Sequence, residues 1–201
     1  MFLSKMRMVG AACRNPYEVH RNLWELFPEN PEAERDFLFR VERADSHRAD
    51  ILMQSFRKPE NSSPNVQSLE SRAYPLILRE GQQLQFLLVA NPVKTISDEN
   101  GRKSATGEPK KCRVPLIRDE DHRGWLLRKL DECASLETLI VDRTTPFHFR
   151  KDRENRFGKI QPVIFQGILT VREPETFACL IRKGIGPAKA FGCGLLSIAR
   201  G

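Results

Sequence analysis

Two aromatic side chains near the N-terminus have types and a spacing suited to chemistry on a phosphate. Tyr17 and His20 lie three residues apart in a segment with helical periodicity, so they are neighbours on one helix face, with Arg21 and Trp24 close by. A histidine with an ordinary pKa of about 6.5 can donate or accept a proton at neutral pH. Tyrosine and arginine side chains can both contact a phosphate. The alternative is an ordinary amphipathic helix with a polar border.

A glycine-rich run near the C-terminus is a second candidate site. Residues 184–194 read GIGPAKAFGCG, with glycines at Gly184, Gly186, Gly192 and Gly194 around Lys189. The run lacks the Gly-Lys-Ser/Thr ending of a P-loop, and it leads into a strand rather than a helix, unlike a dinucleotide-binding loop. Its glycines favour close backbone contact either with RNA or with another part of the protein. A helix C-cap followed by a bulge is the structural alternative.

The third candidate is the basic segment 143–159, RTTPFHFRKDRENRFGK. Aromatic and polar residues alternate along 147–150, which predicts a hairpin with 160–172 as its return strand. Such a hairpin suits a nucleic-acid backbone. Its basic residues are Arg143, Arg150, Lys151, Arg153, Arg156 and Lys159. A second basic cluster comprises Lys103, Lys110, Lys111 and Arg113. For both clusters the alternative is a solvated loop.

The net charge of +7 lies entirely in the second half of the chain. Residues 1–90 hold 12 basic and 12 acidic side chains, whereas residues 91–201 hold 21 and 14. A polyanionic partner would explain this asymmetry through phosphate contacts and counterion release. A basic face that only aids solubility is the alternative.

Metal and cofactor chemistry have no support in the residue spacing. The five cysteines are odd in number, widely spaced and without a C-x-x-C pair, which favours reduced thiols in or near the core. His47, His122 and His148 share no ligand spacing with one another or with a cysteine. We therefore expect no metal and no cofactor.

The elements that must position these residues alternate between strand and helix. Strands are expected at 2–9, 37–41, 51–55, 84–90, 138–142, 145–150, 160–172 and 195–199, and helices from Pro16 to about Phe27, at 119–134 and at 173–183. Residues 57–66 and 97–110 are expected to be loops. The β-α-β-β order indicates ferredoxin-like units within an α+β fold. We expect two domains, 1–90 with the histidine helix and 91–201 with the basic hairpin and glycine-rich loop. No apolar run is long enough to cross a membrane, and no signal peptide is evident, so a soluble, cytoplasmic protein is expected.

Several blocks of the chain together resemble the CasE family, the CRISPR repeat endoribonucleases of subtype I-E systems. They are NPYEVHRNLWELFP in the first helix, DFLFRVE, ANPVKT and KCRVPLI, and the tail GIGPAKAFGCGLLS, which fits a G-h-G-x₅-G-h-G motif (h is apolar). The resemblance covers essentially the whole chain. It implies tandem ferredoxin-like, RRM-related domains and metal-independent cleavage of the repeat hairpin in CRISPR precursor RNA. It also implies retention of the guide RNA product within the multisubunit Cascade complex.

The resemblance further assigns roles to individual residues. His20 falls where the family has its catalytic histidine and Tyr17 where it has a helper tyrosine, while Arg21 and Lys159 match basic positions near the cleavage site. RNA supplies its own nucleophile, the 2′-hydroxyl, so the products would be a 2′,3′-cyclic phosphate and a 5′-hydroxyl. Whether His20 acts as base or acid stays open. The alternatives are an RNA-hairpin-binding subunit that does not cut, and a protein-interaction subunit with an incidental basic face.

Overall fold

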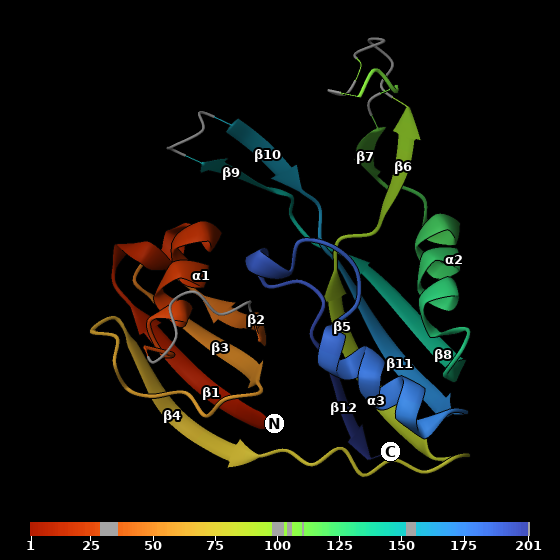
Figure 1. Ribbon diagram of the computed structural model, residues 1–201, viewed down its shortest axis with the longest axis horizontal. Coiled ribbons are helices and arrows are strands. Elements are labelled where there is room, and N and C mark those ends of the chain that lie inside the picture. Colours follow the sequence, from red (N-terminus) through yellow and green to blue (C-terminus); the bar gives the residue numbers. More distant parts are fainter. Residues whose placement is uncertain (29–35, 98–102, 104–105, 110, 152–155, 201) are drawn as a thin grey trace.

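The computed structural model describes residues 1–28, 36–97, 103, 106–109, 111–151 and 156–200, with backbone only at 148–151 and 156–158. Its described strands form two four-stranded antiparallel sheets and two two-stranded hairpins (Figure 1). Each four-stranded sheet has helical cover and its own hydrophobic core. The expected α+β class is confirmed.

The N-terminal domain contains β1 (Phe2–Val9), the 3-10 helix η1 (Ala11–Arg14), α1 (Pro16–Trp24), β2 (Phe37–Ala44), β3 (Arg48–Ser55) and β4 (Val66–Ala73). Its sheet order is β2-β3-β1-β4, the order of a ferredoxin-like sheet. Residues 56–65 connect β3 and β4 without a helix. Alternate side chains of β1, β2 and β3 point toward α1, and Met8, Phe39 and Met53 are buried there with Leu23.

The C-terminal domain contains β5 (Gln83–Ala90), α2 (Asp119–Leu130), β8 (Ala134–Arg143), β11 (Val163–Val171), α3 (Pro174–Lys183), the 3-10 helix η2 (Lys189–Phe191) and β12 (Leu196–Arg200). Its sheet order β12-β5-β11-β8, with α2 and α3 as crossovers, completes a β-α-β-β-α-β ferredoxin-like unit. The tandem ferredoxin-like architecture expected from the sequence is therefore present. Strand β5 belongs to this sheet although it lies within 1–90, so we propose that the domains divide between β4 and β5.

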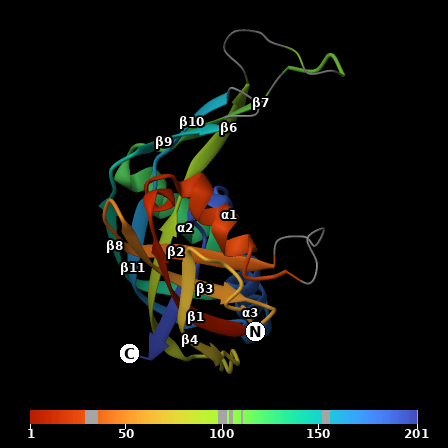
Figure 2. The ribbon, with the colours of Figure 1, turned by 90° about the vertical axis from the view of Figure 1, so that its left-hand side faces the viewer.

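Two hairpins are inserted into the C-terminal domain. β6 (Val93–Ser97) and β7 (Lys111–Pro115) lie between β5 and α2, and β9 (Phe147–Lys151) and β10 (Arg156–Ile160) lie between β8 and β11. In the sheet register, Val163 pairs with both Ala90 and Arg143. The last residues of β5 and β8 and the first residue of β11 therefore lie at the same end of the sheet. Both hairpins consequently project from that end of the domain (Figures 1 and 2).

Several expected elements need correction. The first helix ends at Trp24 rather than near Phe27, and the second ends at Leu130 rather than at residue 134. The return strand of the basic hairpin is β10, whereas β11 pairs with β8 and β5 in the main sheet. Strand β4 begins where the loop 57–66 was expected to end, and β6 and β7 flank the expected loop 97–110.

The two domains are joined along β2, β3 and the end of α3. The Gln54 side chain of β3 donates from Nε2 to the Ile181 carbonyl of α3 at 3.1 Å. Arg40 of β2, only 5% exposed, donates to the Leu87 carbonyl at 3.3 Å and to Ser197 Oγ at 2.7 Å. The Gln54 bond ties β3 to α3, and the Arg40 bonds hold the edge strand β2 against β5 and β12.

Candidate active site

Helix α1 begins as the sequence predicts. The Asn15 side chain accepts a hydrogen bond from the Tyr17 backbone N–H at 3.0 Å, and Pro16 occupies the first turn. Val19 and Leu23 are buried on the side that faces the sheet. This cap and this packing fix the rotation of the helix, and so place Tyr17 and His20 at its half-buried border.

The His20 ring lies among aromatic rings. Its centroid is 5.7 Å from that of Phe37 and 6.3 Å from those of Phe39 and Trp24. Phe37 and Phe39 alternate on β2, so both face α1 from the sheet. Contacts with two rings of the sheet and with Trp24 of its own helix limit the orientations of the imidazole, as proton transfer at a defined atom requires.

Segments of the C-terminal domain meet α1, the helix that carries this histidine. Helix α1 packs against η2 of the glycine-rich loop and against β9. The rings of Phe147 at the base of β9 and Phe191 in η2 are 6.3 Å apart. A cavity of about 320 Å³ lies at this junction, with Pro16 and Phe39 from one domain and Phe147 and Phe191 from the other in its wall. The helix with the candidate catalytic residues therefore adjoins both the glycine-rich loop and the base of the basic hairpin.

The glycines of the loop lie against protein. A Cβ atom on Gly184 would come within 2.7 Å of Leu38, and one on Gly186 within 2.9 Å of Trp125. A Cβ atom on Gly192 would come within 3.4 Å of Phe39, and one on Gly194 within 2.9 Å of the Ile185 carbonyl. These contacts correspond to the second role expected for the loop, close approach to another part of the protein.

The candidate basic residues have different surroundings. Arg21 is exposed and pairs with Glu18 at 3.2 Å, one turn back on α1. The Lys189 ammonium donates to the Lys183 carbonyl at 2.6 Å and so binds the end of α3. Exposed positions on or beside the projecting hairpins are occupied by Lys103, Lys111, Arg113 and Lys159.

The remaining basic candidates can be placed only in part. Backbone positions place Arg150 and Lys151 on β9 and Arg156 on β10. Lys110 and Arg153 lie outside the described residues. The structure therefore places the base of the β9–β10 hairpin against α1.

Several other titratable side chains are buried in the protein interior. His122 is fully buried, and its Nε2 lies 2.9 Å from the Leu116 carbonyl. Burial raises the pKa of Cys133 to about 11 and that of Cys193 to about 12.

Among the described residues, no three His, Cys, Asp or Glu side chains form a group that could hold a metal ion. No described helix is long and apolar enough to span a membrane.

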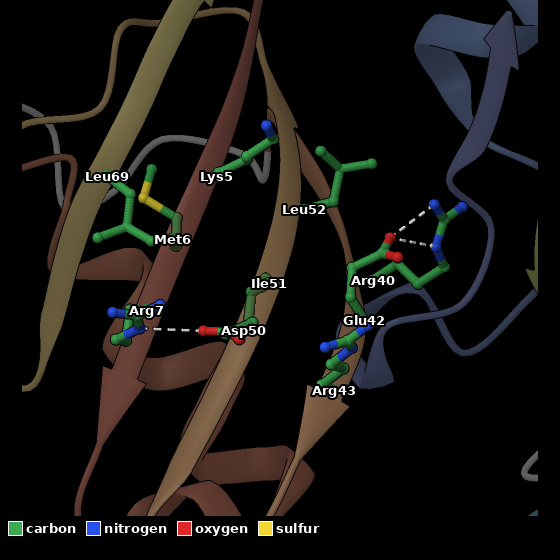
Figure 3. Close-up of a pocket in the computed structure, with 10 residues that line it drawn as sticks. All are labelled: Lys5, Met6, Arg7, Arg40, Glu42, Arg43, Asp50, Ile51, Leu52 and Leu69. Carbon is green, nitrogen blue, oxygen red and sulfur yellow. Dashed lines mark hydrogen bonds and ion pairs between the residues drawn. The ribbon is translucent and has the colours of Figure 1, made fainter.

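A further hollow lies on the face of the N-terminal sheet opposite α1 (Figure 3). Ion pairs cross it: Arg7 Nε lies 3.1 Å from Asp50, and Arg40 Nη2 lies 2.6 Å from Glu42. Hydrogen bonds from Arg48 and Arg7 hold the pKa of Asp50 below its usual range. In Figure 3, Arg40 extends from β2 toward the C-terminal ribbon, which identifies this hollow as the border of the domain interface.

Sequence reasoning missed three groups of residues that line the candidate site, the domain interface or a groove beside them. Phe37 and Phe39, which contact His20, could have been found from their alternation on an expected strand. Arg40 gave no signal, because its partners come from β5 and β12, far along the chain. Arg182 and Lys183 lie at the end of α3, where basic residues are ordinary because they complement the helix dipole.

Comparisons with known proteins match this architecture over its whole length. The family model described as CRISPR associated protein matches residues 1–200. The CRISPR system Cascade subunit CasE of Escherichia coli (strain K12) is 40% identical over 200 residues, 99% of each chain. The CRISPR-associated endoribonuclease Cse3 of Thermus thermophilus is 33% identical over 201 residues, covering 92% of this chain and 90% of that protein.

Solved structures agree with these matches. The crystal structure of the CRISPR-associated protein Cas6e from Escherichia coli str. K-12 superposes with a TM-score of 0.85 at 39% identity, covering 100% of both chains. CRISPR endoribonuclease Cse3 bound to 19 nt RNA gives 0.78 at 30% identity, covering 99% of this chain and 100% of that chain. The chain therefore belongs to the CasE/Cse3 family of CRISPR-associated proteins.

Proposed function

We propose that this protein is an endoribonuclease that cleaves the repeat hairpin of CRISPR precursor RNA and keeps the guide RNA product as a subunit of Cascade. Two relatives carry the names endoribonuclease and Cascade subunit, and Cse3 has been solved with a 19 nt RNA and with an RNA representing a pre-cleavage complex. The proposed substrate is a cellular transcript, so we place the protein's work in the cytoplasm.

The position of His20 is the observation that carries the cleavage proposal. Its ring lies 6.3 Å from that of Phe39, which lines the cavity at the junction of the two domains, and its helix α1 contacts η2 and β9. A stem held by that hairpin would bring its phosphates toward the helix face that carries Tyr17 and His20. His20 would then exchange a proton at the 2′-hydroxyl or the leaving 5′-oxygen, and Tyr17 would assist at the phosphate.

The exposed basic residues supply the binding energy in this proposal. Lys103, Lys111, Arg113 and Lys159 lie on or beside the two projecting hairpins, and the β9–β10 hairpin adds Arg150, Lys151 and Arg156. A-form RNA presents a deep, narrow groove lined by phosphates, so recognition along the stem proceeds by shape and charge. The products would carry 2′,3′-cyclic phosphate and 5′-hydroxyl ends, because the nucleophile belongs to the RNA.

Incubation with the cognate repeat hairpin, followed by mapping of product ends, tests the proposal. We expect His20→Ala to slow cleavage by about 10²–10⁴, the usual contribution of one proton-transfer group, and to leave hairpin affinity nearly unchanged. His47→Ala is the matched control, because His47 is exposed in the turn between β2 and β3. Comparable losses of rate and affinity in His20→Ala would make His20 a binding residue.

A second arm of the assay tests whether cleavage needs a divalent metal ion. Cleavage by a side-chain acid and base needs no divalent ion, so the wild-type rate in EDTA should equal that in magnesium. A rate that EDTA abolishes and magnesium restores, with the RNA fold unchanged, would overturn the mechanism. Binding without any cleavage would identify the protein as a hairpin-binding subunit.

A further inference from the structure

A basic groove lies at the end of α3, apart from the two basic hairpins. Its volume is about 360 Å³, and we call it the flank groove. Phe56, at the end of β3, lies on its wall and is 52% exposed. Arg182 and Lys183 line it from α3 and are both exposed.

The charge of the flank groove is positive. Arg182, Lys183 and Lys189 contribute cations, and Asp36 is the acidic residue among the lining side chains. The Asp36 carboxylate accepts hydrogen bonds from Arg57 at 2.7 and 3.0 Å, so its charge is already matched. Lys189 binds the Lys183 carbonyl and offsets the negative end of the α3 dipole. An anion entering the groove therefore meets unbalanced positive charge.

The flank groove adjoins the candidate active site. Phe37 lines the groove, and its ring is 5.7 Å from the ring of His20. Lys189 also lines the groove and begins η2, which packs against α1. The β9–β10 hairpin contacts the same helix from the C-terminal domain. In Figure 1 this hairpin lies beyond one end of α1, whereas α3 lies toward the opposite side of the molecule.

We propose that the flank groove binds single-stranded RNA next to the scissile phosphate, where the strand leaves the hairpin stem. Phe56 stacks on a base, and Arg182 and Lys183 hold the adjoining phosphates. Stacking on an aromatic ring combined with a basic track is the usual chemistry of single-strand binding, and it accepts any base. The inference rests on the proposed function, because the groove gains this role only if a hairpin is cut beside His20.

The test compares the affinities of four RNAs for the full-length protein. They are the bare hairpin, the hairpin with a 5′ flank, with a 3′ flank, and with both, each carrying a 2′-deoxy sugar at the cleavage position to prevent reaction. The variants are Phe56→Ala and the double change Arg182→Ala/Lys183→Ala. Arg128→Ala/Lys129→Ala is the matched control, because these exposed basic residues occupy the last turn of α2.

We expect the wild type to prefer one flanked RNA over the bare hairpin, and that preference identifies the strand. Phe56→Ala should weaken binding of the flanked RNA by about 5- to 150-fold, the range for loss of one stacked base. The Arg182/Lys183 variant should lower the log–log salt slope for that RNA by about 0.7 for each phosphate that the protein no longer neutralises. Neither variant should change affinity for the bare hairpin.

Two outcomes would overturn the inference. Equal losses for flanked and bare RNA would place these residues at the stem, and unchanged affinity for every RNA would leave the groove to a protein partner. Thermal unfolding of each variant distinguishes a local effect from loss of the fold. A wild type that fails to bind the bare hairpin would instead refute the proposed function.

Discussion

Arg40 should control how firmly the two domains are joined, and its replacement by methionine tests this directly. Its guanidinium donates to Ser197 Oγ at 2.7 Å, to the Leu87 carbonyl at 3.3 Å and to the Leu195 carbonyl at 3.5 Å. It also pairs with Glu42 on its own strand at 2.6 Å. Methionine keeps most of the apolar stem but removes every one of these donors.

The loss of stability expected for Arg40→Met can be estimated from its contacts one by one. Hydrogen bonds from a charged donor contribute about 1.5–3 kcal/mol each, and the short contact to Ser197 is the strongest of the three. The Leu87 carbonyl keeps the Ser197 hydroxyl as a donor at 3.2 Å, so it is not left unsatisfied. The Glu42 side chain is 42% exposed, so its ion pair adds at most about 1 kcal/mol. Relief of the buried charge offsets part of the loss, and we expect a net destabilisation of about 2 kcal/mol.

Urea unfolding followed by tryptophan fluorescence measures this loss. The two tryptophans report different domains, because Trp24 packs on the N-terminal core and Trp125 belongs to the C-terminal core. In single-tryptophan proteins made with Trp24→Phe or Trp125→Phe, the wild-type transitions should coincide. Adding Arg40→Met should lower the midpoint and separate the two transitions, since each domain then unfolds more independently.

Arg43→Met is the matched control for this experiment. Arg43 is an exposed residue of β2 and lines the same hollow as Arg40 (Figure 3). Its replacement should change stability by less than about 0.5 kcal/mol. If Arg40→Met matched this control, with coincident transitions, Arg40 would not be the residue that joins the domains.

Two further predictions concern the RNA surface and the cysteines. Changing Arg150, Lys151 and Arg156 together to Ala should weaken binding of the RNA hairpin. Filter binding across salt should show a log–log salt slope lower by about one unit for each phosphate no longer neutralised. Identical slopes for variant and wild type would mean that the β9–β10 hairpin is only a solvated face. Burial raises the pKa of Cys133 to about 11 and that of Cys193 to about 12. Iodoacetamide at about pH 8 should therefore react slowly with these two thiols and first label the half-buried Cys112 and Cys179. Mass spectrometry of the labelled protein measures the order of reaction. Early labelling of Cys193 would contradict its buried position.

The sequence predicts best the elements that bury one clear face. Strand β1 has the predicted bounds, and Val19, Leu23, Leu26 and Phe27, which follow helical spacing in the sequence, are all buried. Strand β4 escaped prediction because it is an edge strand in which Val66 is the sole buried residue. Helix α2 was predicted too long because Cys133 and Ala134 continue its apolar pattern, although Cys133 is buried in the turn after the helix and Ala134 begins β8.

The candidate site shows the same division between local and tertiary information. Helix periodicity places Tyr17 and His20 on one face, and Asn15-Pro16 defines where that helix begins. The alternation of Phe37 and Phe39 marks them as core-facing, but no local pattern shows that the His20 ring is their neighbour. The glycine spacing indicates close backbone approach, but only the fold shows that Leu38, Phe39 and Trp125 are the neighbours. Contacts between residues distant in sequence carry no short-range pattern, so they were beyond sequence reasoning.

The arrangement of the domains has a consequence for the proposed reaction. His20 belongs to one domain, whereas the basic hairpin and η2 belong to the other. In the proposed reaction, a hairpin bound by the C-terminal domain would therefore be presented to a histidine whose position depends on the domain interface. Misplacement of reacting groups by about 1 Å can cost about 100-fold in rate. In the proposed reaction, the contacts of Arg40, Gln54 and Gly184 across that interface would thus position α1 relative to bound RNA, although none of these residues would need to touch the RNA.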